Sequence, residues 1–408
     1  MKKTVAIVGG GAAGLMAACA AAENGNEVIL FERNSRPARK VMITGKGRCN
    51  VTNNCDTEAF MRNTPHGSRF MYSAINAFSA DDTISFFESR GVRLKTERGN
   101  RVFPVSDKAV DIVDALVDSV KKLDVKIISA RVTDIICDDG KAVGVSCENG
   151  KDFSADRVII ATGGMSYPVT GSTGDGYKMA ERVGHTVTEL RPSIVPIMTK
   201  EGFCSRLCGL SLKNVTLTLY EAGKKKPIFS ELGEMMFTDF GITGPLVLSA
   251  SAYVNKAPEL YSIKVDLKPA LDAETLDKRI LRDFASEPNK DFINSLDALL
   301  PKRLISVVVN LSGIEPRKKV NGITREERSR LVTVIKGLSL SVLRLRPIEE
   351  AVVTSGGISL KEINPATMES KLISGLYFAG EIIDVDCFTG GFNLQTAFST
   401  GYLAGISV

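Results

Sequence analysis

Hydrophobic residues near the start of the chain form two short continuous runs separated by small residues. The runs over 4–8 and 27–31 are rich in β-branched and aromatic side chains, which is typical of buried parallel strands. Between them, residues 12–24 are mostly small and helix-compatible and are followed by Gly25. The pattern predicts a strand, a turn, a helix and a second strand, the order of a βαβ unit.

The turn after the first strand is rich in glycine. Gly9, Gly11 and Gly14 have the spacing GxGxxG, and Glu32 follows the second strand. In a dinucleotide-binding unit the first glycine permits a tight turn, the second admits a pyrophosphate and the third lets the helix pack on the strand, while the acidic residue binds a ribose. The alternative is a secretory signal peptide, but three consecutive glycines interrupt the apolar run that it requires, so we expect the dinucleotide-binding unit.

Strand and glycine patterning recurs later in the chain. Residues 157–161 form an apolar run that leads into the ATGG turn, and residues 376–379 form another that leads into an acidic turn. A double glycine, Gly390-Gly391, then precedes a helix predicted to start near Asn393. In flavoproteins such a helix directs its positive end at the flavin pyrimidine, which favours FAD over NAD as the tightly bound dinucleotide.

The middle of the chain has a different pattern. Short alternating runs over 186–268 indicate β-hairpins or a small barrel, and residues 272–338 indicate helices, including 325–336, which a capping box at Thr324 and Glu327 begins. We therefore expect an α/β protein whose Rossmann-like FAD-binding domain, 1–190 and 345–408, is interrupted by an insertion. The insertion is β-rich and barrel-like over 191–270 and helical over 271–344, and we expect the active site between the two domains.

Composition narrows the function classes. The 52 basic and 47 acidic residues give a net charge of +5 without a basic tail, so we expect no nucleic-acid partner. No apolar run is long enough for a membrane span, and eight cysteines without a CxxC pair indicate reduced thiols, a cytoplasmic location and no metal site. His66 and His185 lie in no catalytic motif. The reactivity is therefore expected to come from a cofactor.

Several longer motifs carry a family resemblance. They are KVMITGKGRCNVTN at 40–53, GSTGDGY at 171–177, MFTDFGITGP at 236–245, TSGGIS at 354–359 and GGFN at 390–393. On these motifs the chain resembles the BaiN-like (YhiN-like) family of FAD-dependent oxidoreductases along essentially its whole length. It departs from the family pattern at Ala38 and Cys387, where glycine is expected, and at Phe392, where tyrosine is usual.

The resemblance implies a set of FAD-binding residues. Those expected at the pyrophosphate, the adenosine ribose and the adenine side are Gly9, Gly11, Ala13, Gly14, Glu32, Arg39, Lys40 and, through its backbone, Val132. Those expected to border or cover the cofactor are Gly45, Arg48, Asn50, Thr162 and Gly163. Those expected at the ribityl chain and the pyrimidine are Glu381, Asp384, Gly391, Phe392 and Asn393.

The resemblance also implies an activity. We expect an NAD(P)H-dependent ene-reductase of α,β-unsaturated 3-oxo steroids, namely 3-oxo-4-ene and 4,6-diene bile acids, acting by hydride transfer from the reduced flavin. The alternatives are a flavin oxidase of a small primary amine and a flavin-dependent RNA-modification protein. Tyr167, Cys387 and Phe388 are candidate catalytic, substrate-side residues because they neighbour flavin motifs. Cys49 and Cys55 are expected to be structural thiols, with a redox disulfide as the alternative.

Overall fold

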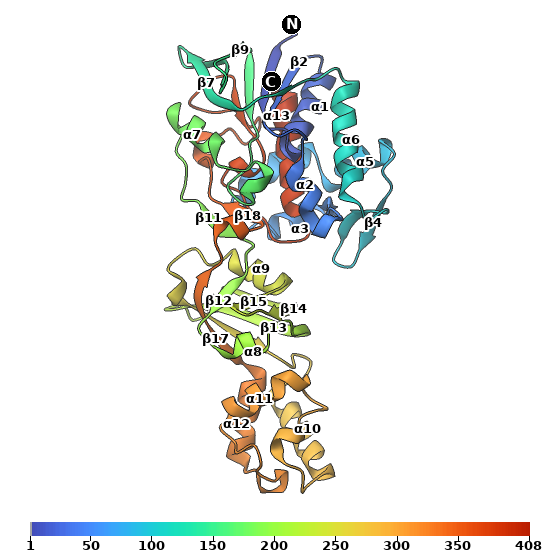
Figure 1. Cartoon of the computed structure of the whole chain (residues 1–408), viewed down its shortest axis with the longest axis vertical. Helices are drawn as coiled ribbons and strands as arrows, with labels where there is room; N and C mark the ends of the chain where they lie inside the picture. Colours follow the sequence, from blue (N-terminus) through green and yellow to red (C-terminus); the bar gives the residue numbers. More distant parts are fainter. Residues whose placement is uncertain (1) are drawn as a thin grey trace. The chain divides into compact units, whose positions relative to one another are not determined.

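The structure is a computed structural model that describes residues 2–408 (Figure 1). The chain folds into two units, each with its own apolar core. Residues 2–193 and 347–408 form the discontinuous unit, and residues 194–346 form the inserted unit. The expected division placed the insertion at 191–344, which lies within a few residues of these boundaries.

A five-stranded parallel sheet is the centre of the discontinuous unit. Its order is β19-β10-β1-β2-β6, with bounds Leu376–Phe378, Arg157–Ile160, Thr4–Val8, Glu27–Glu32 and Lys126–Ser129. The chain leaves β1 toward β2 and β6 on one side and later adds β10 and β19 on the other. Ligands of such sheets bind where the order reverses, beyond the carboxyl ends of the two central strands. Here those strands are β1 and β10.

Two helices that meet at small residues lie side by side against this sheet (Figure 1). They are α1 (Ala12–Glu23) and α13 (Phe392–Ser407), and both are buried over most of their length. A Cβ at Gly401 would lie 2.3 Å from the Ala13 carbonyl oxygen, so the two backbones approach as closely as glycine permits. This packing brings the last segment of the chain onto the first.

Smaller elements complete the discontinuous unit. Three small sheets have the orders β3-β5-β4 (Thr52–Asn53, Arg101–Pro104, Leu94–Glu97), β7-β8-β9 (Val132–Asp138, Lys141–Cys147, Asp152–Ser154) and β11-β18 (Arg191–Ser193, Val353–Ser355). The remaining helices are α2 (Arg39–Ile43), α3 (Thr57–Arg62), α4 (Tyr72–Ala77), α5 (Ala80–Ser89), α6 (Ala109–Lys122) and α7 (Asp175–Arg182).

The inserted unit contains the expected barrel. Its six antiparallel strands close in the order β12-β15-β14-β13-β16-β17, with bounds Ile197–Thr199, Gly241–Thr243, Phe229–Phe237, Ser211–Glu221, Tyr261–Asp266 and Leu338–Leu345. The helices of this unit are α8 (Phe203–Arg206), α9 (Pro245–Ser251), α10 (Ala273–Ser286), α11 (Lys302–Ser312) and α12 (Arg325–Lys336). The predicted capping box of α12 is present.

The expectation that 271–344 is helical was wrong for its last residues, which form β17. Leu338, Leu340 and Val342 are buried and alternate with more exposed residues, which is the period of a strand. β17 pairs with both β16 and β12 and so closes the barrel. Across residues 2–408, the structure has no helix that is both long enough and apolar enough to cross a membrane.

Candidate cofactor site

The glycine turn after β1 is shaped by close backbone contacts. Gly9 has φ +104°, and a Cβ there would lie 2.5 Å from the Ala161 carbonyl oxygen at the end of β10. A Cβ at Gly14 would lie 1.9 Å from the Gly9 carbonyl oxygen, so only glycine lets α1 start this close to the strand. A Cβ at Gly11 would meet nothing within 4 Å. Gly11 therefore leaves open space at the helix N-terminus, where a phosphate can approach the amides.

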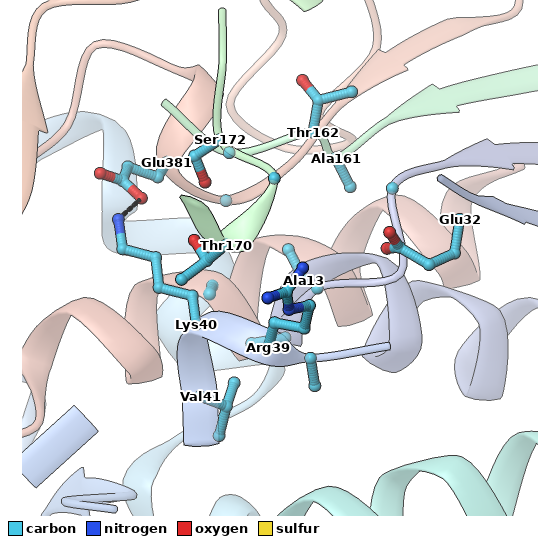
Figure 2. Close-up of a pocket in the computed structure, with 18 of the residues that line it drawn as sticks. Ala13, Glu32, Arg39, Lys40, Val41, Ala161, Thr162, Thr170, Ser172 and Glu381 are labelled. Carbon is cyan, nitrogen blue, oxygen red and sulfur yellow. Dashed lines mark hydrogen bonds and ion pairs between the residues drawn. The ribbon is translucent and has the colours of Figure 1, made fainter. Parts of the chain in front are cut away.

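A cavity of about 1340 Å³, including its open mouth, lies at the carboxyl ends of β1, β2 and β10 (Figure 2). All of its lining residues belong to the discontinuous unit. The cavity is therefore at the predicted crevice of the parallel sheet. The expected cofactor residues that line it are Gly9, Gly11, Ala13, Glu32, Arg39, Lys40, Val132, Thr162, Gly163, Glu381 and Asn393.

Glu32 organises one side of this cavity. Its Oε2 accepts a hydrogen bond from the Gly10 amide (2.9 Å), and its Oε1 accepts one from the Asn34 amide (2.7 Å). Arg39 in turn donates from Nη1 to the Asn34 Oδ1 (3.1 Å). These bonds fix the carboxylate beside the glycine turn, and its remaining acceptor capacity suits a ribose diol.

Lys40 and Glu381 form an ion pair across the cavity from Glu32 (Figure 2). The Lys40 Nζ lies 2.7 Å from the Glu381 Oε2, and the Ser166 hydroxyl donates to the Glu381 Oε1 at 2.7 Å. The Thr354 amide also donates to this oxygen. Arg39 and Lys40, expected together on the adenine side, thus separate: Arg39 lies with Glu32, and Lys40 with Glu381.

The charge of Glu381 is stabilised by these partners. Burial alone would raise the pKa of its carboxyl group, but the charge and hydrogen bond of Lys40 and the Thr354 amide outweigh burial and hold the pKa below the usual value. Glu381 is therefore an anion whose acceptor sites are largely occupied by the protein. It is suited to positioning rather than to proton exchange.

The shape and the polar groups of the cavity fit a bound cofactor. The open space at Gly11 and the anchored carboxylate of Glu32 fit FAD. Thr162 lines the cavity, but its Oγ1 is buried against α7, because a Cβ at Gly176 would lie 2.1 Å from it. This hydroxyl therefore does not face the cofactor. Glu32 and Arg39 would hold the adenosine part, the turn 9–14 the pyrophosphate, and Lys40, Thr162 and Glu381 the remainder.

The start of α13 is held rigidly at the cavity. The Asn393 side chain donates to the carbonyl oxygens of Cys387 and Phe388 and accepts from the Cys387 amide. Gly391 has φ +102°, and a Cβ there would lie 2.4 Å from the Thr52 backbone. Phe392 is buried as the first residue of the helix. Gly391 and Phe392 therefore support the turn without lining the cavity, whereas Asn393 lines it.

Three expected residues of the motif at 40–53 do not line the cavity, namely Gly45, Arg48 and Asn50. Arg48 pairs with Glu97 and Asp107, each at 2.5 Å, and its guanidinium stacks on Phe103. These contacts brace the loop against the β3-β5-β4 sheet. The motif lines the cavity directly through Lys40, Val41 and Thr44. Its last residues also contact the turn before α13, because Asn53 donates to the Gly390 carbonyl oxygen and Thr52 packs on Gly391.

The substrate-side candidates lie outside the cavity lining. Tyr167 is half-buried and has φ +52°, an uncommon backbone conformation for a bulky residue. Phe388 is buried, and its amide donates to the Asn63 carbonyl oxygen. The Cys387 thiol is buried between the hydroxyls of Thr64 and Thr396, and burial raises its pKa to about 12.

The remaining expected groups have structural surroundings. Asp384 is half-buried, and burial raises its pKa. Cys49 and Cys55 are free thiols. Burial raises the pKa of Cys49 to about 12 and that of Cys55 to about 11. These environments suppress the thiolate that redox chemistry requires.

Sequence reasoning missed Asn34, Ser166 and Thr354, which hold the charged groups of the cavity. Asn34 follows Glu32 by two residues, a spacing at which an Asx side chain often bonds locally, so this signal was available. Thr354 lies in the TSGGIS motif, to which no role was attached. Ser166 had no signal of its own, because its partner Glu381 is distant in the sequence.

The fold and the cavity define a dinucleotide-binding flavoprotein of the Rossmann type. The particular family follows from comparison: residues 3–407 match the family described as HI0933-like protein Rossmann domain, and the chain belongs to that family. The family and the fold imply FAD, and the chain is an FAD-dependent oxidoreductase of this family.

Named relatives of similar length fall into two groups. The chain is 31% identical to the 3-dehydro-bile acid delta(4,6)-reductase of Clostridium scindens, over 98% of each chain. It is 33% identical to the ribosomal RNA dihydrouridine synthase of Haemophilus influenzae, over 98% of this chain and 97% of that one. It is 30% identical to the enzyme of the same name from Escherichia coli, over 97% and 95%.

Solved structures share the fold at low identity. A 3-ketosteroid-delta4-(5alpha)-dehydrogenase from Rhodococcus jostii matches with a TM-score of 0.56 at 16% identity, covering all of this chain and 96% of that one. A flavocytochrome c3 fumarate reductase matches with a TM-score of 0.51 at 18% identity, covering all of this chain and 78% of that one. These similarities support the fold alone.

Proposed function

We propose that this protein reduces a carbon–carbon double bond conjugated to a carbonyl group, using FAD that NAD(P)H has reduced. The observation that carries the proposal is that relatives with two different substrates share one bond type. A delta(4,6)-reductase of a 3-oxo bile acid and a dihydrouridine synthase both add two hydrogens to such a bond, because the C5=C6 bond of uracil is conjugated to its C4 carbonyl. Amine oxidation has no comparable support.

The residues of the cavity have distinct proposed roles. When bound, FAD supplies two-electron hydride chemistry. Glu32 would bind the adenosine ribose, the amides after Gly11 would bind the pyrophosphate, and Thr162 would line the wall beside them. The Lys40 and Glu381 pair would hold the ribityl side. The N-terminus of α13 would offer its amides and positive dipole to the pyrimidine and so favour negative charge there.

We propose a uracil ring in ribosomal RNA as the substrate. The inserted unit has 24 Lys and Arg against 17 Asp and Glu, a net charge of +7, whereas the discontinuous unit has 28 against 30, a net charge of −2. The excess positive charge of the whole chain is therefore carried by one unit. A positively charged module attracts the phosphate backbone of RNA. The proposal of an RNA substrate replaces our expectation that the protein has no nucleic-acid partner, which we based on the small net charge of the whole chain.

A 3-oxo-4-ene steroid is the second candidate, because the chain is 31% identical to a bile-acid reductase over nearly its full length. A small apolar substrate would not require the charge of the inserted unit. Among the earlier substrate-side candidates, Tyr167 and Phe388 remain proposals. We assign Cys387 no contact with substrate, because its thiol is wholly buried.

One experiment tests both the reduction of the flavin by NAD(P)H and its reoxidation by the substrate. The FAD-loaded protein is mixed anaerobically with NADH or NADPH while the oxidised-flavin absorbance is followed, and bleaching is expected. An unmodified ribosomal RNA transcript or 4-androstene-3,17-dione is then added. Return of the absorbance with RNA, and dihydrouridine detected by mass spectrometry, supports the RNA substrate, whereas return with the steroid alone supports the second candidate. Bleaching by a small amine but by neither nucleotide would overturn the reductase proposal.

A further inference from the structure

A cluster of polar side chains outside the cofactor cavity surrounds Asp386. The His66 Nδ1 lies 2.7 Å from the Asp386 Oδ1. The Ser193 hydroxyl donates to the Oδ2 at 2.7 Å, and the Ser355 hydroxyl donates to the Oδ1 at 3.0 Å. Asp386 is completely buried, whereas the His66 side chain is 30% exposed. The buried carboxylate therefore anchors one ring nitrogen of a histidine whose side chain reaches solvent.

This arrangement fixes the orientation and charge of the imidazole. Because Nδ1 is bound to Asp386, Nε2 is the ring nitrogen left to exchange a proton. The hydrogen bond that the His66 Nδ1–H donates to Asp386 raises the pKa of His66, and the nearby charge of Asp384 adds to this. Burial and the charge of Arg191 act in the opposite direction but are outweighed. His66 is therefore a better cation near neutral pH than a free histidine.

The cluster adjoins the wall of the cofactor cavity. Asp386 directly follows Val385, and Ser355 follows Val353 by two residues; both valines line the cavity. On the histidine side, a Cβ at Gly67 would lie 2.6 Å from the Val385 Cγ2. The segment that carries His66 therefore packs directly against a residue of the cavity wall.

We propose that His66 is the catalytic acid of the reduction and that Asp386 is its positioning residue. This inference rests on the proposed function, since a proton donor is needed only if a conjugated double bond is reduced. The hydride adds to the β-carbon, the π bond breaks, and the electron pair moves toward the carbonyl. The proton of His66 Nε2 forms the new bond at the α-carbon. The imidazole is left neutral and is reprotonated from water, and the two electrons come from reduced FAD.

Other groups near this region are less suited to the role. The Cys387 thiol has its pKa raised to about 12 by burial and is enclosed by two threonine hydroxyls. The Lys40 ammonium is bound to Glu381 and Ser166. His185 is buried, with its ring nitrogens at Glu362 and Ser370, and burial lowers its pKa. His66 combines a fixed ring, a raised pKa and exposure.

The first test measures the histidine directly. The chain has only two histidines, so ¹⁵N-histidine labelling yields two ring systems that His66→Gln and His185→Gln assign. In the FAD-loaded protein we expect one histidine to titrate above 6.5 and to disappear in His66→Gln. In Asp386→Asn its pKa should fall toward the ordinary value. A His66 pKa below 6.5 in the wild-type protein would overturn the proposal.

The second test separates the two half-reactions. With the substrate that reoxidises the wild-type protein, either the ribosomal RNA transcript or 4-androstene-3,17-dione, His66→Gln should slow flavin reoxidation about 100-fold. Flavin reduction by NAD(P)H should be unchanged, and so should FAD affinity. The wild-type reoxidation rate should fall as pH rises through the His66 pKa. This fall should be absent in His66→Gln and shifted to lower pH in Asp386→Asn.

The outcomes distinguish the inference from the proposed function. If neither compound reoxidises the reduced wild-type protein, the proposed function fails and the assignment of His66 fails with it. If the wild-type protein turns over and His66→Gln reoxidises at the same rate, the proposed function stands and the His66 assignment is overturned. The matched variant His185→Gln, with its unfolding midpoint recorded, should keep the wild-type reoxidation rate.

Discussion

The two units of the chain differ in strand pairing, in packing and in net charge. The discontinuous unit is built around a parallel sheet and packs α1 against α13 at glycine and alanine positions, and it holds the cavity and a net charge of −2. The inserted unit closes an antiparallel barrel with alternating side chains and has a net charge of +7. Close backbone approach suits the binding of a cofactor, and net positive charge suits the attraction of an anionic partner. Under the proposed function, cofactor chemistry and substrate attraction are therefore divided between the units.

The largest expected effect comes from adding a methyl group where α1 contacts the glycine turn. Gly14→Ala would place a methyl group 1.9 Å from the Gly9 carbonyl oxygen, so we expect a loss of about 3 kcal/mol of stability and no bound flavin. Gly11→Ala adds the same methyl group to open space, so stability should change by less than about 0.5 kcal/mol. Its FAD affinity should fall about tenfold. Thermal unfolding and flavin titration measure both, and equal effects of the two variants would contradict this account.

The next effect concerns the buried ion pair of the cavity. Lys40→Met leaves the Glu381 carboxylate without its cation, and we expect a loss of about 2 kcal/mol of stability in the cofactor-free protein. Lys40→Met/Glu381→Gln should recover about half of that loss, because no unpaired charge remains. Urea unfolding of the single and double variants gives the coupling energy. Additive losses would indicate that the two side chains do not interact.

RNA binding is expected to distinguish the two units. Lys225 and Lys226 are exposed in the turn between β13 and β14 of the inserted unit. The variant Lys225→Ser/Lys226→Ser should reduce the slope of log affinity against log salt by about 1 to 2. The matched variant Lys121→Ser/Lys122→Ser, at the end of α6 in the discontinuous unit, should leave the slope unchanged. Filter binding at several salt concentrations measures the slope. Equal slopes for the two variants would contradict a special role of the inserted unit in RNA binding.

A smaller effect is the pH dependence of stability at His66. Its pKa is higher in the folded protein than the ordinary value of 6.5. The ion pair therefore stabilises the fold fully below pH 6.5, and this contribution disappears as pH rises through the folded-state pKa. In the wild-type protein it should be about 1 kcal/mol. His66→Gln should remove that pH dependence, measured by urea unfolding between pH 5 and pH 9. An unchanged profile would show that another group is responsible.

The smallest expected effect is at Ala38, where the family resemblance led us to expect glycine. Ala38 has φ +56°, the left-handed region that glycine adopts without cost. Ala38→Gly should therefore raise stability by about 0.5 to 1 kcal/mol, after the entropy lost by a more flexible unfolded chain. The melting temperature measures this change. A lower melting temperature would mean that packing of the buried Ala38 methyl group stabilises the fold by more than the backbone strain destabilises it.

Local elements were predictable from consecutive residues. The run 4–8 is β1, the capping box at Thr324 begins α12, and the alternation over 186–268 indicated the barrel. These features depend on propensity, periodicity and capping, which act between residues a few positions apart. Even β17 had a visible alternating pattern, but the helices before it led us to extend the helical region too far.

The ion pairs and the packing of the site required the tertiary structure. Lys40 meets Glu381 across 341 positions of the chain, and His66 meets Asp386 across 320. Arg48 looked like a cofactor residue but is bound by Glu97 and Asp107. A charged side chain has several possible partners in the sequence, and only the packing of distant segments selects one, since Coulomb and hydrogen-bond energies depend on distances that no local pattern encodes. The sequence alone therefore determined the Rossmann unit and the family signature, whereas tertiary packing decided which charges lie in the cavity and which histidine a buried carboxylate holds.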